Sequence, residues 1–430
     1  MRLRSACHRL AALLLLTSAS LAAQTPLTPH PIHLDDGRSF NLNLPAEFSI
    51  SVAAQGFHRL RFLTKSPDGR YFATDMHDLG DNDLGRIYIL GRFSPKTGRF
   101  AHVSVYLDHL RNPTNIAFYT DPAGQQWLYF SLTDRLLRYK YRAGDTAPEG
   151  DPEVLANYPA YGLSYKYGGW HLTRTIAFAP LHGQTMLYVA VGSSCDACNE
   201  KEEIRATLSV MYPDGTGAHI VARGLRNAVA LDYIPQIDGG ALFATNMGAD
   251  HLGNDDPEDT FFQLDSNAKP GPITTADADY GWPTCYFSHG VTVPDHLISN
   301  PQPSDVINPK PPVGPPPPQF DCNKVPAAYS TFLPHASPLG FDYFGDDAPA
   351  ALRDSFLVAL HGASWQQLWA TRGYRVARIS TATRQPEDFL TGFVQNGKIL
   401  GRPCGILRIA PNAFLLTDDM SGIIYYVHEK

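Results

Sequence analysis

The sequence predicts an all-β fold, a six-bladed β-propeller, from a repeated segment and the turns that precede it. Six segments share a hydrophobic–aromatic–hydrophobic–small pattern, with leucine at the aromatic position in the last two: Tyr71-Phe72-Ala73-Thr74, Leu128-Tyr129-Phe130-Ser131, Leu187-Tyr188-Val189-Ala190, Leu242-Phe243-Ala244-Thr245, Phe356-Leu357-Val358-Ala359 and Phe414-Leu415-Leu416-Thr417. Turn residues precede each segment, and another apolar run precedes each turn. Such paired runs indicate antiparallel strands, and no helical pattern of comparable length separates them.

The repeats recur with a nearly constant period. Their second residues lie 57, 59, 55, 114 and 58 positions apart, so one period is doubled. We interpret the doubled period as a loop-rich insertion between the fourth and fifth repeats, at residues 265–334, because it contains no second copy of the pattern. Within it, the proline-rich run Pro311 to Pro318 lacks backbone donors and favours an extended surface structure.

The two ends of the repeat array also read as strands. Glu47 to Gly56 predicts the first strand, and Ile423 to Val427 predicts the last. In a propeller such ends commonly pair and close the ring, which removes exposed strand edges. We therefore expect one domain over residues 23–430.

Residues 1–22 have the features of a secretory signal peptide. Arg2, Arg4 and Arg9 precede the apolar run Leu10 to Leu16, and Ser20-Leu21-Ala22 offers small residues for cleavage. The apolar run is too short for a membrane span. The sequence thus predicts a periplasmic or secreted protein without a membrane anchor.

The charge balance argues against nucleic acid as a partner. The leader carries three of the 35 basic residues and no acid, so the remaining chain has 32 basic residues against 42 acidic ones. A net negative surface favours solubility and repels phosphate backbones.

Five cysteines follow the leader. Cys195 and Cys198 could form a metal or redox pair, but no second pair stands at metal-ligand spacing, so we favour a small structural disulfide. We expect Cys285 and Cys322 to bridge across the insertion and Cys404 to stay free, although spacing alone does not fix the connectivity.

Polar residues precede the first apolar run of most repeats at similar distances from the aligned position. The set comprises Asn115, His171, Arg174, Arg226, Asn227, His335, Ser337 and Arg402. In blades around an axis, equal offsets place these side chains at the same end of the ring, so we expect them to converge on one pocket. Its arginines would suit an anionic, planar ligand, because guanidinium groups offer paired donors to carboxylates. The alternative for any single residue is that it caps its own loop.

A second polar segment, His77 to Gly85, contains several acids. They could hold a cation, but we favour a solvated turn.

An ordered series of motifs resembles the glucose/sorbosone dehydrogenase family, especially its L-sorbosone and pyranose dehydrogenase branch. The series is His171-x-Thr173-Arg174, Gly224-Leu-Arg226-Asn227, Asn246-x-Gly248-Ala-Asp250 to Asp259, Asp279-Tyr-Gly-Trp-Pro283, His335-Ala-Ser337-Pro338-Leu-Gly340, Leu360-His361-Gly362 and Gly401-Arg402-Pro403. It runs over residues 55–427. The resemblance implies a six-bladed propeller, pyrroloquinoline quinone (PQQ) as redox cofactor with Ca²⁺ beside it, and oxidation of a sugar or sugar-derived aldehyde.

The resemblance also implies roles for individual residues. His171 would be the general base that takes the substrate proton while hydride passes to the quinone, a task that suits an imidazole near neutral pH. Arg226 and Asn227 would polarise the quinone oxygens, and Arg402 would pair with a cofactor carboxylate. The carbonyls of Gly248 and Ala249, beside Asp250, would ligate Ca²⁺.

Further cofactor contacts are expected from Arg174, His335, Ser337 and His361. The chain departs from the family pattern at Gln366-Gln367, where relatives carry a basic residue, and at Asn115. No haem-attachment motif follows Cys198, so electrons would leave to an external acceptor.

Two other classes of function stay open on the sequence. One is a propeller hydrolase of the lactonase type, in which a bound cation activates water. That reading requires carboxylate ligands at the axis, and Asp250 is the best candidate. The other is a noncatalytic propeller that binds a glycan or a protein.

Overall fold

The computed structural model describes residues 26–160, 171–264, 278–296, 320–363 and 372–430. Within these ranges the chain forms six main sheets. Their strands are β4 (Leu60–Lys65), β5 (Tyr71–Asp75), β6 (Gly85–Ser94) and β7 (Arg99–Leu110); β8 (Ile116–Thr120), β9 (Gln126–Ser131), β10 (Arg135–Tyr141) and β11 (Glu153–Asn157); β12 (Arg174–Leu181), β13 (Gln184–Val191), β14 (Thr207–Met211) and β15 (His219–Arg223); β16 (Ala228–Ile234), β17 (Ala241–Asn246), β18 (Asp259–Gln263) and β22 (Ser330–Phe332); β23 (Pro338–Phe344), β24 (Ser355–Leu360), β25 (Arg375–Ser380) and β26 (Pro386–Leu390); and β29 (Pro403–Ala410), β30 (Ala413–Asp418), β31 (Ile423–Glu429) and β3 (Phe48–Gln55).

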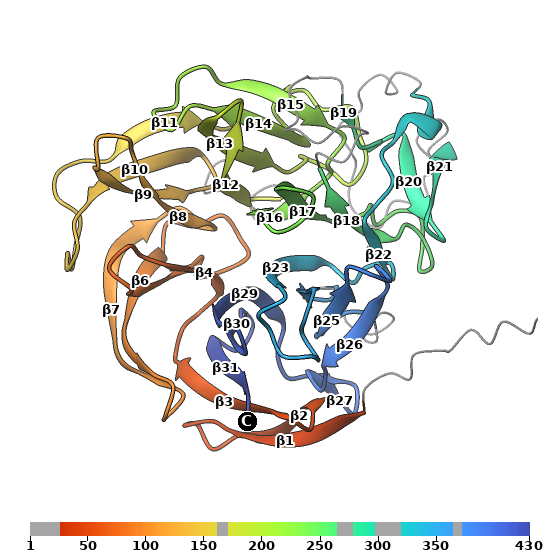
Figure 1. Cartoon of the computed structure of the whole chain (residues 1–430). Coiled ribbons are helices and arrows are strands. Elements are labelled where there is room, and N and C mark those ends of the chain that lie inside the picture. Colours follow the sequence, from red (N-terminus) through yellow and green to blue (C-terminus); the bar gives the residue numbers. More distant parts are fainter. Residues whose placement is uncertain (1–25, 161–170, 265–277, 297–319, 364–371) are drawn as a thin grey trace, which may run out of the picture.

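These sheets are the blades of a ring (Figure 1), and we number them one to six in the order given. The strands β4, β8, β12, β16, β23 and β29 lie nearest the centre. The predicted all-β, six-bladed propeller is therefore confirmed. Each of the six repeats lies in the second strand of its blade, namely β5, β9, β13, β17, β24 and β30.

The ring is closed by the two ends of the array, as predicted. In blade six, β3 pairs antiparallel with β31, from Phe48 opposite Glu429 to Gln55 opposite Ile423. The first strand of the array thus supplies the outer strand of the last blade, and this pairing covers the backbone edge of β31.

In chain order, the predicted insertion at residues 265–334 falls between the fourth and fifth repeats, which lie in β17 and β24. Its range also contains β22, which pairs antiparallel with β18 and completes blade four. A three-residue strand such as β22 is too short to give a clear sequence signal. The proline-rich run lies outside the described residues.

The described parts of the insertion include short strands and a short 3₁₀ helix. β19 (Ala278–Asp279) pairs parallel with β15 and extends blade three, and β20 (Cys285–Ser288) pairs with β21 (Val291–Pro294). The 3₁₀ helix η1 (Cys322–Lys324) is tied to this hairpin by the disulfide between Cys285 and Cys322. A second disulfide joins Cys195 to Cys198, and Cys404 is free and buried. All three predictions for the cysteines are confirmed.

Six clusters of buried apolar side chains fill the joints between neighbouring blades. Between blades four and five, for example, Phe243, Phe261 and Phe356 are fully buried, with ring centroids 4.7–5.4 Å apart. The repeat pattern accounts for this, since the large residue at its centre packs into a joint while its neighbours face the other way.

The small fourth residue of the repeat has a separate role at the joints. Buried hydroxyl groups donate hydrogen bonds to a carbonyl on the entry to the neighbouring blade: Thr74 to Thr114 O (2.6 Å), Ser131 to Arg174 O, Thr245 to Leu339 O (2.9 Å) and Thr417 to Arg61 O (2.7 Å). Blade three has Ala190 at this position, and its strand partner Thr175 makes the equivalent bond, to Val229 O at 2.6 Å.

Blade five has Ala359 at the same position, and there the two blades approach through glycines instead. A Cβ atom on Gly340 would lie 2.6 Å from Cys404 O and 2.8 Å from Gly405 Cα. Close backbone contact thus replaces a hydroxyl bridge at this joint.

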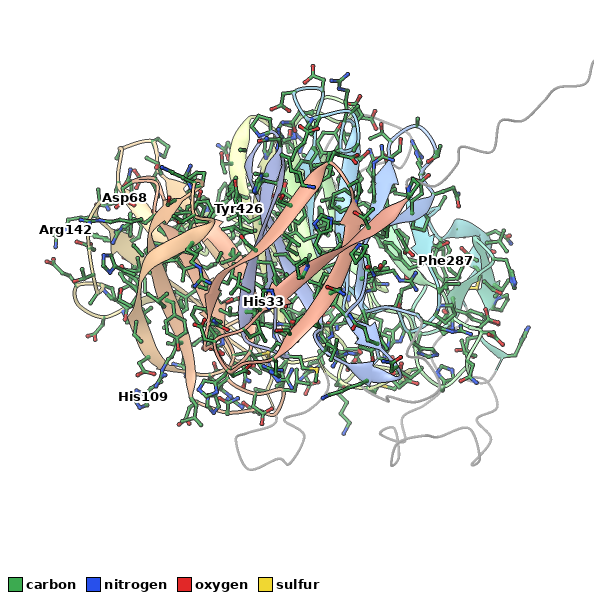
Figure 2. All side chains as sticks on the ribbon, turned by 90° about the horizontal axis from the view of Figure 1, so that it is seen from below. His33, Asp68, His109, Arg142, Phe287 and Tyr426 are labelled. Atoms are coloured by element: carbon green, nitrogen blue, oxygen red, sulfur yellow. A yellow bond between two sulfur atoms is a disulfide. The ribbon has the colours of Figure 1, made fainter. Side chains whose placement is uncertain are left out.

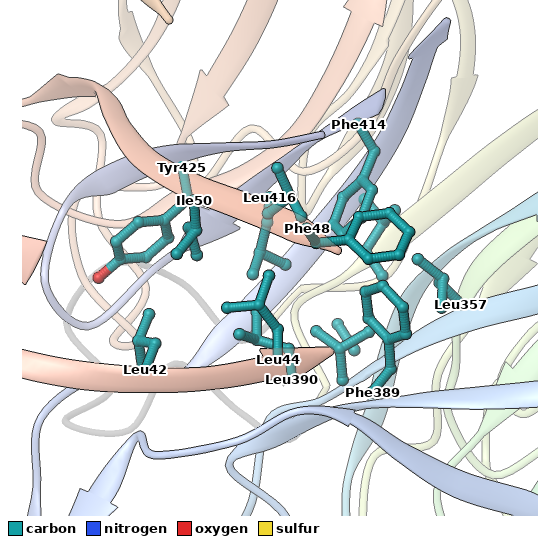
Figure 3. Close-up of a cluster of buried hydrophobic side chains, with 14 of the residues drawn as sticks. Leu42, Leu44, Phe48, Ile50, Leu357, Phe389, Leu390, Phe414, Leu416 and Tyr425 are labelled. Atoms are coloured by element: carbon teal, nitrogen blue, oxygen red, sulfur yellow. The ribbon is translucent and has the colours of Figure 1, made fainter. Parts of the chain in front are cut away.

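An N-terminal hairpin that the sequence analysis did not predict covers part of the ring. β1 (Leu27–His33) pairs with β2 (Ser39–Pro45), and Figure 2 shows the hairpin crossing the side of the propeller, with His33 labelled there. The side chains of Leu42 and Leu44 pack among Phe48, Phe389 and Tyr425 (Figure 3), which extends the core between blades five and six. β27 (Val394–Gln395) and β28 (Lys398–Ile399) form a further small hairpin.

Among the described residues, no helical segment has the length and apolar character needed to cross a bilayer.

We predict that Phe356→Ala lowers the free energy of unfolding by about 3–5 kcal/mol, because the ring is fully buried and its loss leaves a cavity between two blades. Urea denaturation followed by tryptophan fluorescence would measure the loss. Val154→Ala, on the exposed face of β11, is the matched control and should change stability by less than about 0.5 kcal/mol. Equal effects of the two substitutions would contradict this account of the joints.

Candidate functional site

The predicted polar residues lie at one end of the ring. His171, Arg226 with Asn227, His335 with Ser337, and Arg402 immediately precede the inner strands β12, β16, β23 and β29. The inner strands surround the centre in Figure 1, so their starting ends bring these loops together. Contacts confirm the proximity: a Cβ atom on Gly192 would lie 2.6 Å from both His171 Cβ and Asn227 Oδ1. Only glycine fits between these two side chains.

His171 has a defined tautomer. Its Nδ1 lies 3.2 Å from the carbonyl oxygen of Ser193 and 2.8 Å from the hydroxyl of the same residue, which itself donates to Cys195 O at 2.7 Å. Because both atoms act as acceptors here, Nδ1 must carry the proton, and the lone pair lies on Nε2. Burial, and then the nearby Arg226 guanidinium, lower the pKa of His171 well below its ordinary 6.5. The ring is therefore neutral near pH 7 and can accept a proton at Nε2.

Arg226 is buried and held on several sides. Its Nε donates to Asp196 O at 2.9 Å, Nη1 donates to Gly248 O at 2.6 Å, and Nη2 donates to the carboxylates of Asp196 (2.7 Å) and Asp250 (3.3 Å). The Arg226 backbone carbonyl accepts from Ser193 N at 2.7 Å. A single residue, Ser193, thus connects His171 to the strand entry that carries Arg226.

Asn227 carries an unsatisfied acceptor. Its side chain is buried, and its Nδ2 lies 3.3 Å from Met247 Sδ, but Oδ1 has no hydrogen-bond partner among the described residues. An unpaired buried amide oxygen costs free energy unless a donor or cation reaches it. This oxygen lies beside His171 and is available to a ligand.

Arg174 is buried and held by backbone carbonyls. The side chain is 1% exposed, and its guanidinium donates to the carbonyls of His171 and Thr173 at 2.8 Å and of Pro159 at 3.0 Å. Burial lowers the pKa of Arg174 to about 9. The residue thus braces the turn that carries His171, and the cofactor contact expected of it stays a prediction.

The loop after β17 presents Gly248, Ala249 and Asp250. Buried Asp259 accepts from Gly248 N at 2.7 Å with one oxygen and from Ser337 N at 2.7 Å with the other, which ties this loop to the entry of blade five. Burial raises the pKa of Asp259 to about 6. Gly248 O already accepts from Arg226, and a carbonyl has a second lone pair for a cation.

His335 and Ser337 adopt left-handed backbone conformations, with φ of 64° and 53°, as does His171 at 50°. Such conformations are unfavourable for side-chain-bearing residues and persist where surrounding contacts enforce them. His335 Nε2 lies 2.7 Å from Gly253 O, and Nδ1 lies 3.4 Å from the Asp250 carboxylate. The Asp250 carboxylate is thus shared between His335 and Arg226.

A second cluster surrounds Asp419, on the side of blades five, six and one. Its carboxylate lies 2.7 Å from His361 Nε2, 3.0 Å from Arg61 Nη1 and 3.7 Å from Arg59 Nη1. Arg402 Nε donates to His361 O at 3.1 Å. Burial raises the pKa of the nearby Asp418 to about 6, and even with both carboxylates ionised the three guanidinium groups outnumber them.

Two members of this cluster, Arg59 and Arg61, were missed by the sequence analysis. Arg61 Nε and Arg59 Nη1 are buried without a hydrogen-bond partner in the described part of the chain. A signal was present: Arg59 precedes Phe72 by 13 positions, as Arg402 precedes Leu415. Unpaired donors and excess positive charge are what an anionic ligand would satisfy.

Two other candidate sites suggested by the sequence are the acidic loop at residues 77–85 and the Cys195–Cys198 pair. Asp81, in the acidic loop after β5, is buried and paired with Arg111 Nε at 2.8 Å, so this acid is neither solvated nor free for a cation. The group Cys195, Cys198 and Glu200 has metal-binding proximity, but both cysteines are in a disulfide and offer no thiolate. Gln366 and Gln367 lie outside the described residues.

Comparisons with known proteins identify the fold. No protein-family model matches the chain, and no curated protein matches it. Among solved structures, the holo form of the pyranose dehydrogenase PQQ domain from Coprinopsis cinerea shares 16% identity over 90% of this chain and 97% of its own, with a TM-score of 0.66. A calcium structure of a Trichoderma reesei enzyme of carbohydrate-active family AA12 shares 14% identity over 95% and 98%, with a TM-score of 0.67. The apo form of the soluble aldose sugar dehydrogenase of Escherichia coli shares 12% identity over 89% and 100%, with a TM-score of 0.53. This chain thus has the same propeller fold as these solved structures.

We predict that His361 makes folding sensitive to acid. Burial, followed by the Arg402 guanidinium, lowers the pKa of His361 to about 4, whereas the unfolded chain binds this proton below about 6.5. Between these values the unfolded state holds more protons, so stability falls as pH falls, by on the order of 3 kcal/mol in total. In urea denaturation at pH 4.5–7, His361→Gln should reduce the dependence of the unfolding free energy on pH. His219→Gln, which alters an exposed histidine on β15, should leave it unchanged; identical slopes for both variants would contradict the assignment.

Proposed function

We propose that this protein is a PQQ- and Ca²⁺-dependent oxidoreductase of the glucose/sorbosone dehydrogenase family, which oxidises a sugar or sugar-derived aldehyde. The observation that carries the proposal is the neutral His171, with its lone pair on Nε2, beside the unpaired Asn227 oxygen and the buried Arg226. The shared fold with a PQQ domain and with sugar dehydrogenases supports it. The substrate, the dependence on Ca²⁺ and the external electron acceptor belong to the proposal.

The donor chemistry of the site fits both groups. Arg59, Arg61 and Arg402 offer guanidinium donors for the carboxylates of PQQ, and two of them have unpaired donor atoms. The carbonyls of Gly248 and Ala249 and the amide oxygen of Asn227 are hard oxygen ligands of the kind that Ca²⁺ takes. When bound, PQQ would supply a two-electron acceptor and Ca²⁺ a polarising charge.

The residues of this chain would perform the remaining tasks. Nε2 of His171 would take the proton of the substrate hydroxyl, and the Ser193 carbonyl would keep the ring in the competent tautomer throughout. Arg226 would stabilise developing negative charge without moving, because its guanidinium is already fixed by carbonyls and carboxylates. Arg174 would hold the His171 turn in place through the carbonyl of that residue.

The hydrolase alternative receives less support. It requires a carboxylate at the axis that can hold a cation, and Asp250 is already shared between Arg226 and His335.

The proposed activity can be tested directly. Purified protein would be titrated with PQQ, followed by its absorption spectrum, and then assayed for dye reduction with aldoses and sorbosone, with and without Ca²⁺. Saturable binding and turnover that is lost after chelation are expected. If the protein showed no binding of PQQ and no turnover, the proposal would be wrong.

We predict that His171→Ala lowers kcat by about 10²–10⁴-fold with PQQ binding retained, since only the proton acceptor is removed. Steady-state assays on the reconstituted enzyme would measure the loss. His33→Ala, on the exposed N-terminal hairpin (Figure 2), is the control and should match the wild type. A normal kcat for His171→Ala would remove this residue from the mechanism.

We also predict the pH dependence. Because the pKa of His171 lies well below 6.5, the free base persists below that pH, and kcat/KM should stay level across pH 6–7.5 and fall only in more acidic solution. A fall in kcat/KM centred at about 6.5, the unperturbed histidine value, would contradict the lowered pKa of His171.

A further inference from the structure

Asp196 connects the loops that build the candidate site. Its Oδ1 accepts from Arg226 Nη2 and from Asp250 N, each at 2.7 Å, and its Oδ2 accepts from His251 Nδ1 at 2.9 Å. One carboxylate thus holds the guanidinium expected at the cofactor and the backbone of the loop expected at the cation.

The backbone of Asp196 contributes as well. Its carbonyl oxygen accepts from Arg226 Nε at 2.9 Å and from Trp282 Nε1 at 2.9 Å. Arg226 therefore meets Asp196 along a whole edge of the guanidinium, through Nε and Nη2 together, which fixes its orientation far better than one contact would.

The Cys195–Cys198 disulfide holds Asp196 in place. Asp196 follows Cys195 directly, and the bridge closes a four-residue loop with a Cα–Cα distance of 6.2 Å between its buried cysteines. The carbonyl of Cys195 accepts from the Ser193 hydroxyl, which is also the partner of His171. The loop is thereby linked to both residues expected at the reacting atoms.

His251 extends this arrangement to the insertion. Its Nε2 lies 2.8 Å from the Asp295 carboxylate, so the ring bridges Asp196 and Asp295. Despite burial, the hydrogen bonds to these two carboxylates raise the pKa of His251 to about 9. Asp196 is therefore the carboxylate that faces two cations, Arg226 and His251, while Asp295 faces only the second among the described contacts.

We propose that Asp196, presented by the Cys195–Cys198 loop, is the positioning residue that orients Arg226 and the Gly248–Asp250 loop for ligand binding. The described contacts of Arg226 use four of the five guanidinium hydrogens and leave one on Nη1. Asp196 accepts two of these hydrogen bonds, from Nε and from Nη2, and so determines which guanidinium hydrogen stays available to a ligand. The ligand-binding part of this inference rests on the proposed function; the orientation of Arg226 does not.

The test compares Asp196→Asn with Asp295→Asn. Each change removes one carboxylate from His251, but only the first touches Arg226, so the second is a matched control. Asparagine at position 196 keeps an oxygen for Arg226 but sets an NH₂ group or a neutral oxygen against the His251 cation, which should displace the side chain.

The first readout uses the ligand-free protein and needs no cofactor. In ¹⁵N–¹H spectra of arginine side chains, the signal of the Arg226 Nη2–H that donates to the Asp196 carboxylate would be assigned by its loss in Arg226→Lys. A slowly exchanging signal is expected in the wild type and in Asp295→Asn, and its loss is expected in Asp196→Asn. A protected, unshifted signal in Asp196→Asn would overturn the proposal whether or not PQQ binds.

The second readout is the dissociation constant for PQQ. Asp196→Asn should raise it by about 10–100-fold, the range found when residues that orient ligand-binding groups are replaced. Asp295→Asn should change it by less than about threefold. If the wild type binds no PQQ, the proposed function fails while the spectra still decide the role of Asp196.

A second variant guards against misfolding of the first. Cys195→Ser with Cys198→Ser keeps Asp196 but releases its loop. We expect a weakened Arg226 signal with the thermal transition of the whole propeller retained. If untying the loop leaves both that signal and PQQ affinity at wild-type values, the disulfide has no part in positioning Asp196.

Discussion

The structure depends on how each blade meets the next. At every joint an apolar cluster is accompanied by one close polar or backbone contact, made by Thr74, Ser131, Thr175, Thr245 or Thr417, or by the approach of Gly340 to Gly405. Apolar packing alone tolerates small shifts between blades, whereas a shift would break the close hydrogen bond that each buried hydroxyl makes to the next blade. These contacts set the height of each inner strand, and therefore the height at which its preceding loop presents a side chain.

Charge compensation organises the centre in a similar way. Arg226 and His251 are balanced by Asp196, Asp250 and Asp295, whereas the cluster around Asp419 keeps more guanidinium groups than ionised acids. Charges are thus balanced around Arg226, whereas the cluster around Asp419 has too few negative charges. That asymmetry suits a ligand with carboxylates at one end and a reacting centre at the other.

Much of the fold could be predicted from the sequence, because the period of the repeats and the alternation of side chains along each strand determine it. The six second strands, the pairing of the chain ends and the convergence of the polar loops all follow from the repeat and its offsets. The N-terminal hairpin could not be predicted, since its strands pack only because blades five and six offer Phe389 and Tyr425 to Leu42 and Leu44. Arg174 shows the limit of offsets: position follows from the repeat, but the direction of a long side chain depends on nearby carbonyls. Asp196 does not stand at the offset from the aligned repeat position that the other polar residues share. Only its hydrogen-bond distances in the structure reveal its role.

The closure of blade six has a consequence for biosynthesis. Because β3 comes from the start of the array and β31 from its end, a growing chain holds an incomplete ring until β31 is made. The inner end of β29, with Arg402, is also among the last parts to arrive. Fragments that end before β29 would lack both the pairing partner of β3 and the loop that carries Arg402, so translation must reach blade six before the ring and the candidate site can be complete.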